Sequence, residues 1–123
     1  MDILLDTNFI LECVKQKVDF IDFIVFGNVL IPNIAMKELK ELTTDKRLKL
    51  KDRELSKVAL DVIRACEYIK IIPLEGPLDD AIVNYVENTE KETAVATFDR
   101  ELKDRLRHKS RIISLNNKKI KLY

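Results

Sequence analysis

The sequence contains few of the residues that build metal or redox sites through sulfur and imidazole. Its 123 residues include only two cysteines, Cys13 and Cys66, and one histidine, His108. The cysteines have no CxxC spacing, so with a single histidine they cannot assemble a conventional zinc site. We expect both to be reduced, buried thiols in a cytoplasmic protein, where disulfides are rare.

Long apolar runs are also lacking. The longest, Phe20 to Pro32, is interrupted by Asp22, Gly27 and Asn28, which makes it unsuited to span a bilayer. The N-terminus carries Asp2 and Asp6 rather than a basic start and a long apolar core, which argues against a signal peptide. The sequence therefore predicts a soluble protein with no membrane partner.

Net charge is nearly absent as well. A net charge of +1 does not favour any class of charged partner. Any affinity for nucleic acid must therefore come from local basic patches. The composition, 46% hydrophobic and 35% charged, is globular. The length predicts a single domain, residues 1–123, large enough to bury a core.

Short apolar segments that predict strands alternate with amphipathic segments that predict helices. The expected strands are Ile3–Leu5, Val29–Ile31, Ile69–Ile72, Thr93–Thr97 and Ile112–Leu115, with an edge strand in Lys119–Tyr123. The expected helices are Asp6–Val14, Asp19–Phe26, Ile34–Leu42, Arg53–Tyr68, Asp79–Asn88 and Asp99–Arg107. The alternation predicts an α/β fold in three layers, with a parallel sheet covered by helices on both faces.

Two segments are less clear. The second helix is rich in aromatic and β-branched residues, so strand is its main alternative. The polar, basic segment Thr43–Arg53 reads as a surface loop or the frayed start of the next helix. In that next helix, Leu55, Val58, Val62 and Ala65 are expected to form the buried face.

Acidic residues follow the predicted strands. Asp6, the pair Asp79-Asp80, and Asp99 each lie just after a strand or at the start of the next helix. Because parallel strands all end at one edge of a sheet, these carboxylates should converge there. Glu38, about one helical turn further on, can lean back toward the same edge.

Each of these residues also has a purely structural interpretation. Asp6 and Asp99 are good helix N-caps, and Asp79 and Asp80 suit the positive end of a helix dipole. Glu38 could be a solvated helix charge. Thr7, Asn8 and Thr97 could be caps or turn residues. Only their joint position at one sheet edge favours a site.

Several carboxylates in one crevice raise each other's pKa values unless a cation compensates. Oxygen ligands without His or Cys suit Mg²⁺ or Mn²⁺. Such an ion lowers the pKa of bound water and neutralises charge on a phosphoryl group. The predicted chemistry is therefore phosphodiester hydrolysis.

Four segments together resemble the PIN-domain nuclease family. They are Leu4–Asn8 (LLDTN), Glu38 after Pro32-Asn33, Asp80–Val83 (DAIV) and Ala94–Leu102 (AVATFDREL). The resemblance covers essentially the whole chain. The resemblance is strongest to archaeal PIN proteins related to ribosomal-RNA-processing nucleases. VapC-type toxin ribonucleases are near relatives of these proteins.

The resemblance implies a Mg²⁺- or Mn²⁺-dependent endoribonuclease on a sheet of strand order 3-2-1-4-5. It implies metal-binding roles for Asp6, Glu38, Asp80 and Asp99, with Glu101 as a fifth acidic position and Asn8 and Thr97 in support. Asp80 is preferred to Asp79 because Val83 and Val86 then fall where the family's helix is apolar. Asp79 remains an alternative that assists or takes over.

An RNA substrate would be held through its phosphates. Two basic segments are candidates, each with a solvated surface as the alternative. The first includes Lys46 and Arg47, and the second includes Arg100, Lys103, Arg105 and Arg107, with Arg100 as the best candidate for a phosphate contact. Phe98 could stack on a base, but we expect it to be buried.

Other functions compete with the nuclease: a receiver-like phosphoacceptor domain should open with paired acids and carry a late strand-end lysine, which disfavours it. A haloacid-dehalogenase-like phosphatase needs a second Asp two residues after the first, where this chain has Asn8. The third is a PIN fold that binds RNA or protein without cutting. A toxin would pair with an antitoxin and often form a homodimer, for which Phe20–Phe26 could supply a face, whereas a processing enzyme would work with a ribosome-assembly partner.

Overall fold

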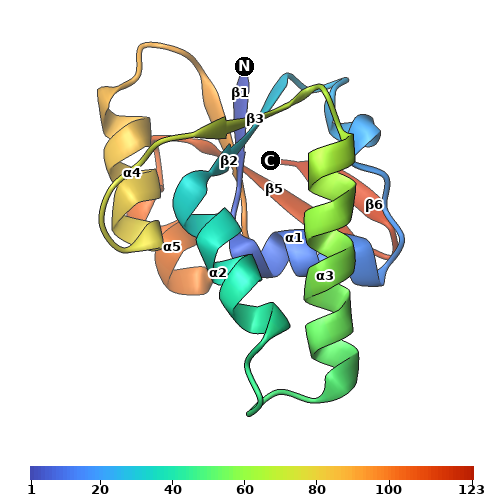
Figure 1. The fold of residues 1–123 in the computed structure, drawn as a ribbon. Helices are drawn as coiled ribbons and strands as arrows, with labels where there is room; N and C mark the ends of the chain where they lie inside the picture. Colours follow the sequence, from blue (N-terminus) through green and yellow to red (C-terminus); the bar gives the residue numbers. More distant parts are fainter.

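Six strands form one sheet in the computed structural model, which describes residues 1–123 (Figure 1). Strand β1 (Asp2–Leu5) lies at the centre, between β2 (Asn28–Pro32) and β4 (Thr93–Ala96). Outside them lie β3 (Ile69–Ile72) and β5 (Arg111–Asn116). These five strands are parallel in the order β3-β2-β1-β4-β5, which confirms the predicted order.

The edge strand expected at the end of the chain is also present. Strand β6 (Lys119–Leu122) pairs antiparallel with β5. Asn117 and Lys118 make the turn between them with positive φ angles of 50° and 66°. Two residues with positive φ are typical of a tight hairpin turn.

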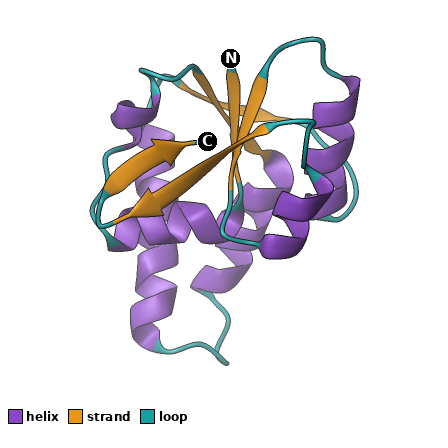
Figure 2. Ribbon diagram, turned by 180° about the vertical axis from the view of Figure 1, so that it is seen from behind, coloured by secondary structure: helices purple, strands orange, loops and turns teal.

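Helices cover the two faces of the sheet. On one side lie α1 (Thr7–Lys15), α2 (Asn33–Thr43) and α3 (Leu50–Ala65), and on the other α4 (Leu78–Asn88) and α5 (Arg100–Arg105) (Figures 1 and 2). The chain runs from β1 to β3 in one direction across the sheet and from β3 to β5 in the other. Because crossovers are right-handed, the two sets of helices lie on opposite faces. The direction changes beside β1, which makes its C-terminal end the switch point where such sheets bind ligands.

The core is built on the central strands. All residues of β1 and β4 are buried. Except for Asp2 and Thr93, they belong with the buried sides of the helices to one apolar cluster of 29 residues. In α4, Ile82, Val83 and Val86 point inward as predicted. The rigid centre fixes the positions at which β1 and β4 end, and those ends carry the acidic residues.

The predicted helix Asp19–Phe26 is wrong. Only one turn of 3-10 helix, η1 (Phe20–Phe23), forms there, with Asp19 accepting a hydrogen bond from the Ile21 N–H at 3.0 Å. The chain must then enter β2 beside β1. At Gly27 it passes so close to the Met1 carbonyl that any side chain would collide.

The buried face of α3 is also not the predicted one. Ser56, Ala59, Leu60 and Ile63 are buried, whereas Val58 is exposed. Both sets of residues follow the helical period, and contacts with α1 and α2 select the second. The helix starts at Leu50, so the loop that follows α2 is shorter than the predicted Thr43–Arg53.

Both cysteines are free thiols, but only one is fully buried. Cys13 lies in the core, and burial raises the pKa of its thiol to about 12. Cys66, at the end of α3, is only half-buried, so the expectation that it would be buried is wrong. None of the helices combines the length and the apolar character needed to cross a membrane.

Candidate active site

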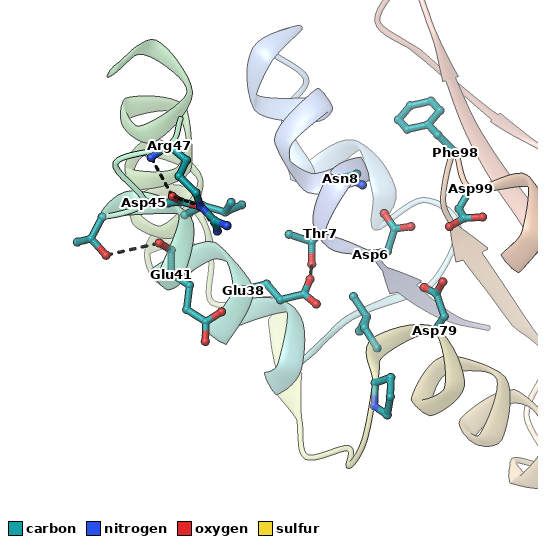
Figure 3. Close-up of a pocket in the computed structure, with 14 residues that line it drawn as sticks. Asp6, Thr7, Asn8, Glu38, Glu41, Asp45, Arg47, Asp79, Phe98 and Asp99 are labelled. Carbon is teal, nitrogen blue, oxygen red and sulfur yellow. Dashed lines mark hydrogen bonds and ion pairs between the residues drawn. The ribbon is translucent and has the colours of Figure 1, made fainter. Parts of the chain in front are cut away.

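An open pocket of about 1000 Å³ lies at the C-terminal edge of the sheet (Figure 3). Acidic residues are the largest group in its lining, and they come from two helices, the N-caps of two others and one loop. These are Asp6, Glu38, Glu41, Asp45, Asp79 and Asp99. Figure 3 shows the carboxylates of Asp6, Asp79 and Asp99 pointing toward a common space, with Glu38 further along the pocket.

Asp6 ends β1 and caps α1. Its Oδ1 accepts a hydrogen bond from the Phe9 N–H at 2.8 Å, and its side chain is almost completely buried. Burial raises the pKa of Asp6 to about 6. Hydrogen bonds from the Thr97 hydroxyl and the Phe9 N–H lower this pKa, while the charges of Asp79 and Asp99 raise it further.

Asp99 has the same role at the end of β4. Its Oδ1 accepts a hydrogen bond from the Leu102 N–H at 3.1 Å and so caps α5. The Thr97 hydroxyl accepts a hydrogen bond from the Asp99 N–H at 3.0 Å, so buried Thr97 connects the Asp6 carboxylate to the backbone of Asp99. Capping occupies one oxygen of each residue. The interpretation of Asp6 and Asp99 as helix caps is therefore compatible with their interpretation as site residues.

The preference for Asp80 over Asp79 is not matched by the structure. Asp79 lines the pocket, whereas Asp80 is exposed and forms an ion pair with Arg105, at 2.8 Å between Oδ1 and Nη2. The reason is the helical period: Asp79 precedes Ile82, Val83 and Val86 by three, four and seven residues, which places it on the inward face of α4. Asp80 is rotated about 100° away.

The pKa of Asp79 reflects the pocket. Burial and the charge of Asp99 raise it, Arg105 lowers it, and Glu38 and Asp80 add smaller increases. The negative charges of the other carboxylates thus disfavour the ionised form of Asp79. A cation placed among them would relieve this repulsion.

Glu38 on α2 also reaches the pocket, as predicted. The Thr7 hydroxyl donates a hydrogen bond to its Oε2, so the first residue of α1 orients this carboxylate. Asn8 is exposed and lines the pocket beside it. Two acidic neighbours, Glu41 and Asp45, were not predicted; the signal for Glu41 was its spacing of three residues from Glu38 on one helix face.

Of the predicted basic residues, only Arg47 lines the pocket. Its guanidinium is held by Asp45, with Nε and Nη2 at 3.0 and 2.9 Å from the two carboxylate oxygens. This bond lowers the pKa of Asp45. The others lie outside the lining: Lys46, Arg100, Lys103, Arg105 and Arg107. Glu101, the expected fifth acid, is exposed and is also not part of the lining.

Phe98 lines the pocket and is 39% exposed, so the expectation that it would be buried is wrong. Its ring stacks on that of Phe9, with centroids 5.0 Å apart and an interplanar angle of 24°. Phe9 is completely buried.

The donors of the pocket suit a hard cation, because all of them are oxygens. They do not form a closed cage: no three Asp, Glu, His or Cys side chains are arranged so that together they could hold a metal ion. Mg²⁺ is usually held by one or two carboxylates and keeps several waters. An open pocket with separated carboxylates fits this mode of binding.

A family model and a solved structure both match this chain. Residues 3–118 match a family model described as a PIN-like domain. The structure is similar to the solved structure of the PIN domain endonuclease Utp24, with a TM-score of 0.78 and 28% identity over 98% of this chain and 90% of that one. A search of curated proteins finds no match.

Proposed function

Because this chain belongs to the family of PIN-like domains, we propose that it is a metal-dependent endoribonuclease. PIN nucleases hydrolyse phosphodiester bonds in nucleic acids and generally use divalent ions. The observation that carries the proposal is the position of Asp6, Asp79 and Asp99 around one space at the C-terminal edge of the sheet. The similar Utp24 protein is described as an endonuclease, which supports internal cleavage.

One or two of the carboxylates of Asp6, Asp79 and Asp99 would hold the ion, Mg²⁺ or Mn²⁺, directly, and the others would act through its waters, with Glu38 as a further ligand or as the group that orients water. When bound, the ion supplies a water of lowered pKa and neutralises charge on the phosphate. Thr97 keeps Asp6 and Asp99 in place through its hydroxyl, and Thr7 does the same for Glu38. Asn8, which also lines the pocket, would contact the phosphate or the water that attacks it.

Basic side chains around the rim would position the RNA backbone. Arg105 is held toward the site by Asp80, and Arg47 by Asp45. Exposed Arg100, next to Asp99, and Lys46, Lys103 and Arg107 extend the positive surface on both sides. These contacts supply affinity without reading the sequence.

The experiment is RNA cleavage in Mn²⁺ or Mg²⁺, with Asp79→Asn and Asp80→Asn as a matched pair. Asp79→Asn should lower the rate about 10²–10³-fold, the loss typical when one charge-stabilising group is removed. Asp80→Asn should have a smaller effect, through Arg105. Equal loss in both variants would contradict the assignment of Asp79, and no cleavage by the wild type would contradict the proposed activity.

The alternative is a PIN fold that binds RNA without cutting it. Calorimetric titration with Mn²⁺ separates the two, since the nuclease must bind the ion and the inert module need not.

Two cellular roles, both in the cytoplasm, fit the proposed activity. One is processing of ribosomal RNA with a ribosome-assembly partner, and the other is toxin-type cleavage controlled by an antitoxin. A homodimer would use the apolar side chains of Ile21, Ile24 and Val25, which the η1 region exposes. Light scattering tests the dimer, and a monomer would remove it.

A further inference from the structure

Phe98 differs from the chain's other exposed large apolar side chains in its position. The others are Ile21, Ile24, Val25, Leu50, Val58, Ile71 and Tyr123, and none of them lines the acidic pocket. Phe98 does, directly before Asp99 in the chain. A partly exposed aromatic ring therefore lies beside the proposed reaction centre (Figure 3).

The ring is also supported from behind. It stacks on Phe9 with centroids 5.0 Å apart, and Phe9 makes an edge contact with Phe23 at 6.0 Å. Both supporting rings are completely buried. Phe98 is further fixed along the chain, because its neighbours Thr97 and Asp99 are joined by a hydrogen bond. The open face is thus part of a rigid aromatic stack.

Phe98 is the only aromatic residue in a lining otherwise made mainly of acids, other polar side chains and three non-aromatic apolar residues. A flat apolar face next to a centre for phosphate chemistry is suited to a nucleobase. Single-stranded nucleic acids are bound by aromatic side chains on which bases stack, and every base offers such a face. In a duplex these faces are covered by neighbouring base pairs.

From this geometry we infer that Phe98 is a stacking platform for one unpaired base of the RNA next to the scissile phosphate. The inference rests on the proposed function and adds a requirement for the substrate: at least one nucleotide beside the cleaved bond is unpaired. Phe98 is a substrate-positioning residue. Because stacking is tolerant of base identity, it gives the site a preference for unpaired RNA without a strict sequence.

The first test uses Phe98→Leu, which keeps apolar volume but removes the ring face, with Phe98→Tyr as the matched control. Cleavage is measured on single-stranded RNA oligonucleotides in which one base at a time is replaced by an abasic site. For the wild type, one abasic position near the cut should lower kcat/KM about 5- to 100-fold, the range expected for a stacked base. Phe98→Leu should show the same loss on intact RNA, and no further loss at that position. Phe98→Tyr should resemble the wild type.

The result that overturns the platform is an equal abasic penalty in the wild type and in Phe98→Leu. Thermal melts identify a variant that loses activity by unfolding. Phe98→Tyr keeps the inference testable if Phe98→Leu is unstable, because the ring and the abasic penalty should then persist together.

A binding readout separates this inference from the proposed activity. RNA with 2-aminopurine at each position in turn is mixed with protein and followed by stopped-flow fluorescence before cleavage. One position should be quenched by the wild type and by Phe98→Tyr, but not by Phe98→Leu. Quenching without cleavage in any metal would sustain the platform and contradict the nuclease. No quenching by the wild type would overturn the platform whether or not the RNA is cut.

Discussion

Strand β1 has a buried carboxylate near each end, and the two differ in their neighbours. Asp2 is 4% exposed and Asp6 is 6% exposed. Asp2 accepts hydrogen bonds from the Tyr85 hydroxyl at 3.0 Å and from the Asn28 side-chain amide at 3.3 Å, so it ties β1 to α4 and β2. Asp6 faces Asp79 and Asp99, which raise its pKa. Burial is thus nearly the same for both, and the neighbours distinguish an acid that joins structural elements from the acid proposed for the site.

The largest expected difference between these two residues is in catalysis. Asp6→Asn keeps an acceptor for the Phe9 N–H but removes the charge, and should lower the rate of RNA cleavage about 10²–10³-fold. Asp2→Asn, at the other end of the strand, should leave kcat unchanged within about twofold. Steady-state kinetics with Mn²⁺ measures both. If the two substitutions reduced the rate equally, the comparison would fail.

A second difference concerns stability without metal. The pKa of Asp6 in the folded protein is about 6, above its unfolded value of 3.8, so the folded state binds the proton more tightly. The free energy of unfolding should therefore fall as the pH rises from about 4 to above 6, by about 2–3 kcal/mol. Asp6→Asn should remove this loss and stabilise the metal-free protein at pH 7.5. Urea denaturation at pH 4.5 and 7.5 measures the free energy of unfolding of both proteins. A pH dependence in Asp6→Asn equal to that of the wild type would contradict this prediction.

Divalent ions should restore the stability that the metal-free protein loses when Asp6 ionises. A ligand that binds only the folded state adds about 2.7 kcal/mol at one hundred times its Kd. Mn²⁺ should raise the Tm of the wild type and of Asp2→Asn, and do so much less for Asp6→Asn. Differential scanning fluorimetry gives this comparison, and equal shifts in all three proteins would speak against Asp6 as a ligand.

The smallest expected effect is at the Asp2 end. Tyr85→Phe removes the hydroxyl that donates to Asp2 Oδ2 and should destabilise the fold by about 1 kcal/mol, the usual value of one hydrogen bond. Cleavage should not change, because Tyr85 bonds Asp2 at the end of β1 opposite to Asp6 and is not part of the pocket lining. Denaturation midpoints and cleavage kinetics on one preparation test both statements. A loss of activity without a loss of stability would show that the Asp2 end of β1 contributes to catalysis.

Much of the fold could be predicted because local patterns and topology agree. Short apolar strands alternating with amphipathic helices allow a three-layer sheet, and the ends of β1 and β4 then locate Asp6 and Asp99. The η1 region was misjudged because its apolar density suits several structures. What decides there is the close approach of Gly27 to Met1, which no local pattern contains.

The site was predicted to the level of segments but not of every residue. The spacing of Asp79 from Ile82, Val83 and Val86 places it on the inward face of α4 and in the pocket lining, whereas the preference for Asp80 rests on Val83 and Val86 alone. Glu41 and Asp45 join the pocket because α2 continues past Glu38 and the following loop turns back. The exposure of Phe98 depends on Phe9 filling the space behind it, which is a tertiary contact between distant segments.

The two edges of the sheet limit how this protein can associate with itself. Strand β3 has four residues and is followed by Pro73, and strand β6 has four residues with Lys119 and Lys121 exposed. Short edges that carry lysine or end at proline are poor templates for added strands. Fibrous growth through backbone pairing is therefore disfavoured, and contacts between copies must be made by side chains.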